Sequence, residues 1–282
     1  MQVRLTTLCE NTVAGLGCIG EWGLSILVEA GDKTVLLDTG LSDSMLRNAM
    51  ALNVDLSKVN KILISHGHAD HTGGLRFLLQ RLRRRVEIYA HPEIWDKKYT
   101  CLPLPGSGEK MYRHIGMPYC REELEGLGAV FMESSEPVWL NEYMVATGEV
   151  PLVTSFEKVD DNMFIRAEEG FVPDTLPDDQ ALVVKTDRGL VVVLGCAHRG
   201  MVNTLMHAQK ITGIEKIYAV VGGTHLFRAQ REQLDRSMAA LRKLGVERIG
   251  VSHCTGLAPA AVLAREFGDK FFFNNAGTVV EL

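Results

Sequence analysis

Short apolar segments rich in β-branched residues alternate with segments of helical periodicity along most of the chain. In the first half, apolar runs of strand length are separated by turn residues such as Gly31 and Asp32, and the longer runs repeat their apolar positions every three to four residues. This pattern predicts strands at 24–29, 34–37, 61–65 and 86–90, a helix at 42–52 capped by Ser42, and a helix at 73–82.

The second half repeats this order. Strands are predicted at 181–186, 190–194, 216–221, 248–251, 270–273 and 278–281, and helices at 202–211, 230–244 and 258–267. Each half has strands first and helix-flanked strands afterwards, which predicts an α/β protein with two sheets packed face to face and helices outside. We see no fixed-period repeat and no linker, so residues 1–282 are expected to form a single domain.

One stretch breaks the pattern. Residues 91–127 contain four prolines and several glycines, and we expect them to be irregular. A long irregular insertion in a compact domain is more often a lid or a binding loop than a passive linker. We therefore expect this insertion to carry substrate selectivity.

Composition excludes several functional classes. The chain has 46% hydrophobic and 23% charged residues and a net charge of −5, which is ordinary for a soluble protein and argues against nucleic acid as a partner. The basic residues Arg81 and 83–85 fit a solvated helix end. We find no targeting or membrane segment, and the six scattered cysteines form no C-x-x-C pair, so we expect reduced thiols in the cytoplasm.

The strongest chemical signal lies at 65–74, directly after a buried strand. His66 and His68 are two residues apart in an extended segment, so both imidazoles face the same way and bind one ion. Asp70 and His71 follow as the chain turns and point at a second position nearby. Imidazole and carboxylate ligands suit Zn²⁺ and other borderline divalent ions. This loop predicts a metal site.

Three further histidines each follow a predicted strand and stand beside glycines. They are His198, His225 and His253. Strand ends at one edge of an α/β sheet are where such folds gather their chemistry, so we expect these side chains to join the site. His91, His114 and His207 have no such setting and are expected to be ordinary surface or loop residues.

His66, His68, Asp70 and His71 match the His-x-His-x-Asp-His hallmark of the metallo-β-lactamase superfamily, which this chain resembles over nearly its whole length. The segments 10–12, 21–25, 178–182, 195–198 and 253–256 are similar to one branch. That branch contains uncharacterised metal-dependent hydrolases and an archaeal enzyme that joins a dihydropterin to a ribofuranosylaminobenzene phosphate. The resemblance implies an αββα four-layer sandwich of two mixed sheets with one or two metal ions at the strand edge.

Two departures from the superfamily pattern concern the ligands. Most members carry Gly-Asp, with a metal-bridging Asp, where this chain has Gly195-Cys196, and a His where it has Asp178-Asp179-Gln180. We infer that His198 replaces a missing ligand, which makes His66, His68, Asp70, His71, His198 and His253 the expected metal ligands. Cys196 is expected either to bind as a thiolate or to be a small buried thiol.

The leading hypothesis is a hydrolase in which a metal-bound hydroxide attacks a small phosphorylated or ester substrate. Zinc is the first choice, with manganese or iron as alternatives. Asp70 would orient the water or bind a second ion, and His225 would stabilise developing charge or protonate the leaving group. Thr255 and Gly256, at the start of a helix, are candidates for phosphate binding. Glu21 is a candidate pocket residue, and Trp22 is expected to pack.

Three other functions remain open. The first is a transferase that uses the same centre to join a dihydropterin to a ribofuranosylaminobenzene phosphate. The second is a non-haem di-iron redox protein, although such relatives usually carry Glu at position 68 and an attached flavin domain. The third is a metal-binding module without catalysis. The sequence leaves open the exact substrate, the number of metal ions and the oligomeric state, a homo-oligomer included.

Overall fold

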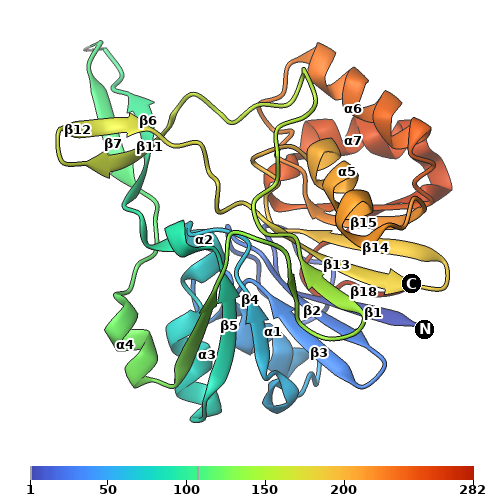
Figure 1. Cartoon of the computed structure of the whole chain (residues 1–282), viewed down its shortest axis with the longest axis horizontal. Coiled ribbons are helices and arrows are strands. Elements are labelled where there is room, and N and C mark those ends of the chain that lie inside the picture. The colour runs from blue at the N-terminus through green and yellow to red at the C-terminus, as the bar shows by residue number, and fades with distance from the viewer. Residues whose placement is uncertain (1, 107) are drawn as a thin grey trace.

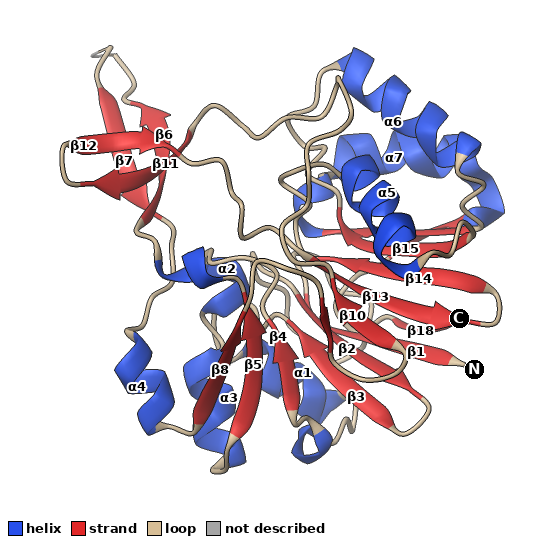
Figure 2. Cartoon of the chain, viewed as in Figure 1, coloured by secondary structure: helices blue, strands red, loops and turns tan. Residues whose placement is uncertain are grey.

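The computed structural model describes residues 2–106 and 108–282. Two seven-stranded mixed sheets lie face to face, and helices cover the outer face of each (Figures 1 and 2). The first sheet, in the order β18-β1-β2-β3-β4-β5-β8, contains β1 (Val3–Cys9), β2 (Ser25–Ala30), β3 (Lys33–Leu37), β4 (Lys61–Leu63), β5 (Val86–Ala90), β8 (Ala129–Glu133) and β18 (Val279–Glu281). The second, in the order β17-β16-β15-β14-β13-β10-β9, contains β9 (Val138–Trp139), β10 (Met144–Ala146), β13 (Ala181–Thr186), β14 (Gly189–Leu194), β15 (Ile217–Gly223), β16 (Arg248–Ser252) and β17 (Phe271–Phe273).

The helices divide between the two outer faces (Figure 2). The α-helices are α1 (Ser44–Ala51), α2 (Ala69–Thr72), α3 (Leu75–Leu82), α4 (Arg121–Gly126), α5 (Met201–Thr212), α6 (Arg231–Lys243) and α7 (Leu257–Phe267). Short 3-10 helices lie at Leu56–Lys58, Pro92–Trp95, His253–Thr255 and Gly268–Lys270. In chain order, α1, α3 and α4 pack on the first sheet, and α5, α6 and α7 on the second.

Three apolar cores separate the four layers. Residues such as Ile26 and Val193 fill the space between the sheets. Met45 and Leu78 join the first sheet to its helices, and Leu205 and others do the same for the second. Each fully buried Leu or Ile contributes about 1.5–3 kcal/mol, so these cores hold the layers together. The predicted αββα sandwich is confirmed.

A third, four-stranded sheet, which we call the small sheet, stands apart from the sandwich above α2 (Figures 1 and 2). Its strands, in the order β12-β11-β6-β7, are β6 (Lys98–Pro103), β7 (Lys110–His114), β11 (Met163–Ala167) and β12 (Gly170–Pro173). The expectation that 91–127 is irregular is therefore wrong, because this segment contains β6, β7 and α4. Pro92 opens a 3-10 helix, Pro103 ends β6, and Pro105 and Pro118 lie outside the strands, where proline is tolerated.

The other differences are local. α1 begins at Ser44 with Asp43 at its cap position, and the hydroxyl of Ser42 donates instead to Glu21, so the expected Ser42 cap is wrong. The apolar pattern also missed β1, because nearly all its residues are buried and alternation is lost. The strands β8 to β12 were missed as well, and most of them are short or only partly buried.

Candidate metal centre

Four strands end at the same edge of the sandwich and carry the candidate ligands. The strand β4 leads into the loop at 66–71 and β16 leads into His253. The strand β14 leads into His198, and β15 leads into His225. Because β14, β15 and β16 are parallel neighbours, their carboxyl ends lie side by side. The structure thus brings residues from 66 to 253 into one cluster.

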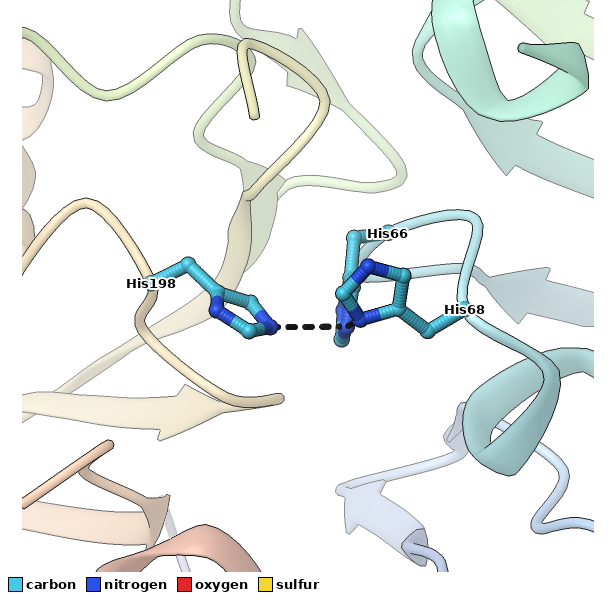
Figure 3. Close-up of side chains that lie close together, drawn as sticks. All are labelled: His66, His68 and His198. Carbon is cyan, nitrogen blue, oxygen red and sulfur yellow. Dashed lines mark hydrogen bonds between the residues drawn. The ribbon is translucent and has the colours of Figure 1, made fainter. Parts of the chain in front are cut away.

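Three imidazole nitrogens converge in a first group (Figure 3). His66 Nε2 lies 2.9 Å from His68 Nδ1 and 3.2 Å from His198 Nε2. Two nitrogens bound to one tetrahedral ion at about 2.0–2.1 Å would lie about 3.3 Å apart. The spacing of this group fits a single divalent ion.

A second group lies beside the first and contains Asp70, His71 and His253. His71 Nε2 is 3.2 Å from His253 Nε2, and Asp70 Oδ2 is 3.3 Å from His253 Nε2 and 3.9 Å from His71 Nε2. Cys196 Sγ lies 3.2 Å from His71 Nε2 and is also grouped with His66 and His71. A carboxylate, imidazoles and a thiol are a donor set suited to a second borderline ion.

Outer hydrogen bonds turn bare nitrogen lone pairs toward the cluster. Nδ1–H of His71 donates to Asp38 Oδ2 at 2.7 Å, and the ring nitrogens Nδ1 of His66 and His253 face Ser65 Oγ at 2.9 Å and Asn11 Oδ1 at 3.0 Å. With Nδ1 engaged in this way, Nε2 is the nitrogen that each ring points inward, and it is an acceptor whenever the ring is neutral. Facing lone pairs repel unless a cation lies between them, so the site fits a metal.

Asp38 also fixes the metal loop itself. Its Oδ1 accepts the N–H of Ser65 and its Oδ2 accepts the Ser65 hydroxyl, both at 2.7 Å. Gly195 packs so closely on this pair that a Cβ there would lie 2.1 Å from Ser65 Oγ. A side chain at 195 would therefore displace the loop that carries His66.

Burial sets the charge state of the first group. Burial, together with the neighbouring histidines, lowers the pKa of His66 and His198 well below the usual range, and burial lowers the pKa of His68 to about 3. These imidazoles are neutral ligands. For His71, burial opposes protonation but Asp38 and Asp70 outweigh it and raise its pKa to about 9. The same carboxylates would attract a divalent cation.

Backbone strain gathers at this edge. Asp38, Ala197, His225 and His253 have φ values of 57°, 56°, 50° and 54°, in the left-handed region that favours glycine. Each stands at or within a few residues of the end of a strand that leads into the cluster. Strained residues persist only where the surrounding structure holds them, and such residues cluster at functional sites. Their concentration at this edge therefore supports a functional site here.

His225 lies between His198 of the first group and the carboxylate of Asp160. Its ring centroid is 4.1 Å from that of His198, and its Nε2 lies 3.2 Å from Asp160 Oδ2. Burial opposes protonation of His225, but the hydrogen bonds to Asp160 and Cys254 raise its pKa to about 10. A protonated His225 at this position is a hydrogen-bond donor beside the cluster.

Cys196 and Cys254 are buried next to each other below the cluster. Cys254 Sγ lies 3.3 Å from the Cys196 carbonyl and accepts the N–H of His225, also at 3.3 Å. Both thiols are free. Cys196, Cys254 and His225 form a further group with ligand atoms within 4.8 Å of one another. The Cys196 thiol is therefore buried and also lies beside His71 of the second group.

Glu21 lies away from the cluster's centre. Its carboxylate accepts hydrogen bonds from the Ser42 and Ser44 hydroxyls and from the N–H groups of Leu41 and Ser42. These bonds hold the entry to α1, so Glu21 does not present a free carboxylate to substrate. The sequence pattern could not indicate that these hydrogen bonds occupy the Glu21 carboxylate.

Thr255 and Gly256 border a second cavity that lies beside His253 and has a volume of about 410 Å³. The Thr255 hydroxyl is 2.9 Å from the Thr224 hydroxyl, which ties the ends of β15 and β16 together. Gly256 occupies the cap position of α7 and makes no side-chain cap. The side chain of Thr255 therefore does not cap α7.

The cluster lies at the floor of an open cleft of about 570 Å³. Trp22 lines this cleft with 54% of its surface exposed and its ring centroid 5.1 Å from that of His253, so the expectation that it simply packs is wrong. The small sheet contributes Thr100, Arg113 and His114 to the walls. His114, at the end of β7, therefore borders the cleft, contrary to its expected ordinary surface role.

Sequence reasoning missed several residues that hold the candidate ligands and their loops in place. Neither Asn11 nor Asp38 was assigned a role, although each orients a histidine. Asp178 Oδ2 accepts the N–H of Gly67 at 2.8 Å, and Asp179 Oδ2 accepts the N–H of Arg199 at 2.9 Å, so this acidic pair braces the loops around His66 and His198. Their position directly before β13 was the available signal.

Among the described residues, no helix combines the length and apolarity needed to cross a membrane.

Comparisons with known proteins agree with this architecture. The chain is 33% identical to the 7,8-dihydropterin-6-methyl-4-(β-D-ribofuranosyl)-aminobenzene-5′-phosphate synthase of Methanocaldococcus jannaschii, over 99% of this chain and 96% of that protein. Among solved structures, it resembles Tm1679, described as a metal-dependent hydrolase of the β-lactamase superfamily, with 31% identity, a TM-score of 0.84 and 99% of each chain covered. The short form of human tRNase Z shares the fold at 13% identity, with a TM-score of 0.52 and 98% of each chain covered.

The family model described as the metallo-beta-lactamase superfamily matches residues 23–253, which include both groups of candidate ligands. With the four-layer sandwich, the His-x-His-x-Asp-His loop and a relative 33% identical over the full length, the chain belongs to the metallo-β-lactamase superfamily, whose fold binds divalent metal ions.

Proposed function

We propose that this protein is a metal-dependent hydrolase that acts on a small phosphorylated or ester substrate. The observation that carries the proposal is the set of inward-facing donor atoms at the floor of an open cleft. The first group contributes three nitrogens, which leaves a fourth position of a tetrahedral ion available to a substrate or a water molecule. A purely structural metal site would be closed.

In this proposal, His66, His68 and His198 hold one divalent ion, and Asp70, His71 and His253 hold a second, with Cys196 beside it. Zinc is the first choice because all these ligands suit it, and manganese or iron are alternatives. When bound, such ions lower the pKa of coordinated water and polarise a phosphoryl or carbonyl oxygen.

The chain's own side chains position the reactants. Asp70 is partly exposed at the cleft, and its Oδ2 lies 3.3 Å from His253 Nε2, so its carboxylate is placed to orient an attacking water. His225 lines the same cleft and is kept protonated by Asp160, which makes it the candidate donor to the leaving group or to developing negative charge. Thr255 and Gly256 remain candidates for binding a substrate group in the neighbouring cavity.

The transferase alternative is favoured by one observation, the 33% identity to the archaeal synthase over nearly the whole of both chains. In that function the same cleft would bind a dihydropterin and a ribofuranosylaminobenzene phosphate. Incubation of the protein with pterin pyrophosphate and the aminobenzene nucleoside phosphate separates the two. A condensed product supports the transferase, whereas hydrolysis of either compound with no condensed product supports the hydrolase.

Metal content tests both the hydrolase proposal and the transferase alternative. Protein purified without added metal is expected to contain one or two equivalents of a divalent ion, and dialysis against a chelator is expected to abolish turnover. His68→Ala is expected to lose metal, whereas His207→Ala, on the outer helix α5, is the matched control and should retain it. Full activity in the metal-free protein would overturn the proposal, and iron with oxygen consumption would instead support the redox alternative.

We also propose a reducing compartment, the cytoplasm, as the site of action. All six cysteines are free, including the adjacent buried pair Cys196 and Cys254. A thiol needed at a metal centre requires its reduced form.

A further inference from the structure

The small sheet presents two chemically different faces. In β6 and β7, Thr100 pairs with Arg113, and on the other side of β6 it pairs with Met163 of β11. Residues directly opposite one another in antiparallel strands point to the same face. Arg113, Thr100 and Met163 therefore form one cross-strand row, and all three line the metal cleft.

The opposite face is aromatic. Tyr112 stacks on Phe171 with ring centroids 3.8 Å apart and planes 1° apart, and Tyr99 and Phe164 pack around them. Arg166 lies over Phe171, 4.9 Å from the ring centroid. This aromatic layer stabilises a sheet that none of the described helices covers, and the same sheet carries the cleft-facing row.

Arg228 faces the cleft from the other wall, in the connection between β15 and α6. Its guanidinium lies 5.2 Å from the ring centroid of Phe227 and forms no ion pair within 4 Å with a described carboxylate. The side chain of Arg113 likewise has no hydrogen bond or ion pair to any residue that the structure describes. By contrast, Arg121 and Arg242, which lie elsewhere on the surface, are both paired with glutamates.

Within the cleft itself little neutralises Arg113, whereas Arg228 also borders a neighbouring cavity together with Asp160 and Asp161. The carboxylate among the residues that line the cleft is Asp70, which belongs to the second ligand group. Between the two arginines the walls are largely apolar and include Leu102, Met163 and Phe227. Two unpaired guanidiniums above an apolar cleft are suited to a ligand with an anionic group joined to an apolar body.

We propose that Arg113 and Arg228 bind a phosphate of the substrate that is not the reacting group. This inference rests on the proposed function and deepens it. The reacting bond lies at the His and Asp cluster on the floor, whereas Arg113 lies on the small sheet, so the substrate carries its phosphate at the end away from the reacting bond. The apolar walls and Trp22 contact the body between these ends. The small sheet is thus the recognition element for the phosphate end.

The test uses the metal-loaded protein and benzylphosphonate, a non-hydrolysable probe with an aromatic body, with benzyl alcohol as its neutral counterpart. Binding is measured by calorimetry for the parent protein and for Arg113→Gln, Arg228→Gln and Arg166→Gln. The last variant is the matched control because Arg166 lies on the aromatic face of the same sheet. Arg113→Gln and Arg228→Gln are expected to weaken benzylphosphonate about tenfold or more, with binding of benzyl alcohol unchanged and Arg166→Gln within about twofold of the parent.

Equal weakening in all three variants, or no weakening in Arg113→Gln, would overturn the inference. Loss in Arg228→Gln alone would also overturn it, because the small sheet would then have no part in recognition. Since this measurement needs no turnover, it is independent of the proposed reaction. Arginine-dependent binding without hydrolysis of any phosphoester or ester would contradict the proposed hydrolase while leaving this inference intact.

Discussion

The ammonium of Lys98 lies 2.9 Å from Asp178 Oδ1, and both side chains are almost completely buried. Lys98 also pairs with Asp174 at 3.0 Å, and the second oxygen of Asp178 accepts the N–H of Gly67 between His66 and His68. Lys98 is the first residue of β6 and Asp174 directly follows β12. This buried ion-pair group therefore joins the small sheet to the metal loop.

Lys98→Met is expected to destabilise the protein by about 3–5 kcal/mol, because it leaves two buried carboxylates without their cation. Denaturation in urea would measure this free energy of unfolding. Lys33→Met is the control, since Lys33 pairs with Asp32 on the surface and such pairs contribute about 0–1 kcal/mol. Equal effects of the two substitutions would contradict a stabilising role for the buried group.

Asp38→Ala is expected to lower metal affinity by about 10–100-fold, because His71 and the Ser65 loop lose the acceptor that orients them. Competition with a chromophoric chelator measures this change directly. Asp43→Ala removes an exposed carboxylate paired with Arg47 and should leave affinity unaltered. Unchanged affinity in Asp38→Ala would mean that the ligands hold their positions without this support.

The two ligand groups predict separate losses of metal. In protein that carries two ions, His198→Ala is expected to remove the ion of the first group and His253→Ala the ion of the second, so each variant should retain about one equivalent. Elemental analysis after gel filtration gives the stoichiometry. Loss of both ions from either variant would show that the groups bind cooperatively, which contradicts independent sites.

Gly74→Ala tests how tightly the metal loop packs on the first sheet. A Cβ at position 74 would lie 2.0 Å from the carbonyl oxygen of Thr39, next to Asp38. We expect a loss of at least about 2 kcal/mol in stability, because backbone must move to relieve this contact. Gly126→Ala in α4 meets nothing within 4 Å and should be neutral or slightly stabilising. Thermal unfolding of both variants makes the comparison, and similar melting temperatures would contradict it.

Local sequence patterns predicted most strands and helices of the sandwich. The predicted strands at 181–186 and 190–194 match β13 and β14, and the helices at 202–211 and 230–244 match α5 and α6 within one or two residues. These elements have strong periodicity over their own length, and periodicity is a local property. The small sheet was not predicted, because it forms when β6 pairs with β11, and pairs such as Thr100 with Met163 are more than sixty positions apart, which leaves no local signal.

The sequence alone determined which residues are available for metal chemistry, since His66, His68, Asp70 and His71 stand together in one loop and the other histidines follow strands. Only the tertiary structure decided what each one faces. Ser65, Asp38 and Asn11 determine which ring nitrogen points inward, and the α1 entry turns Glu21 away from substrate. Apart from Ser65, these partners are distant in the chain from the side chains they orient, so they meet only in the folded structure.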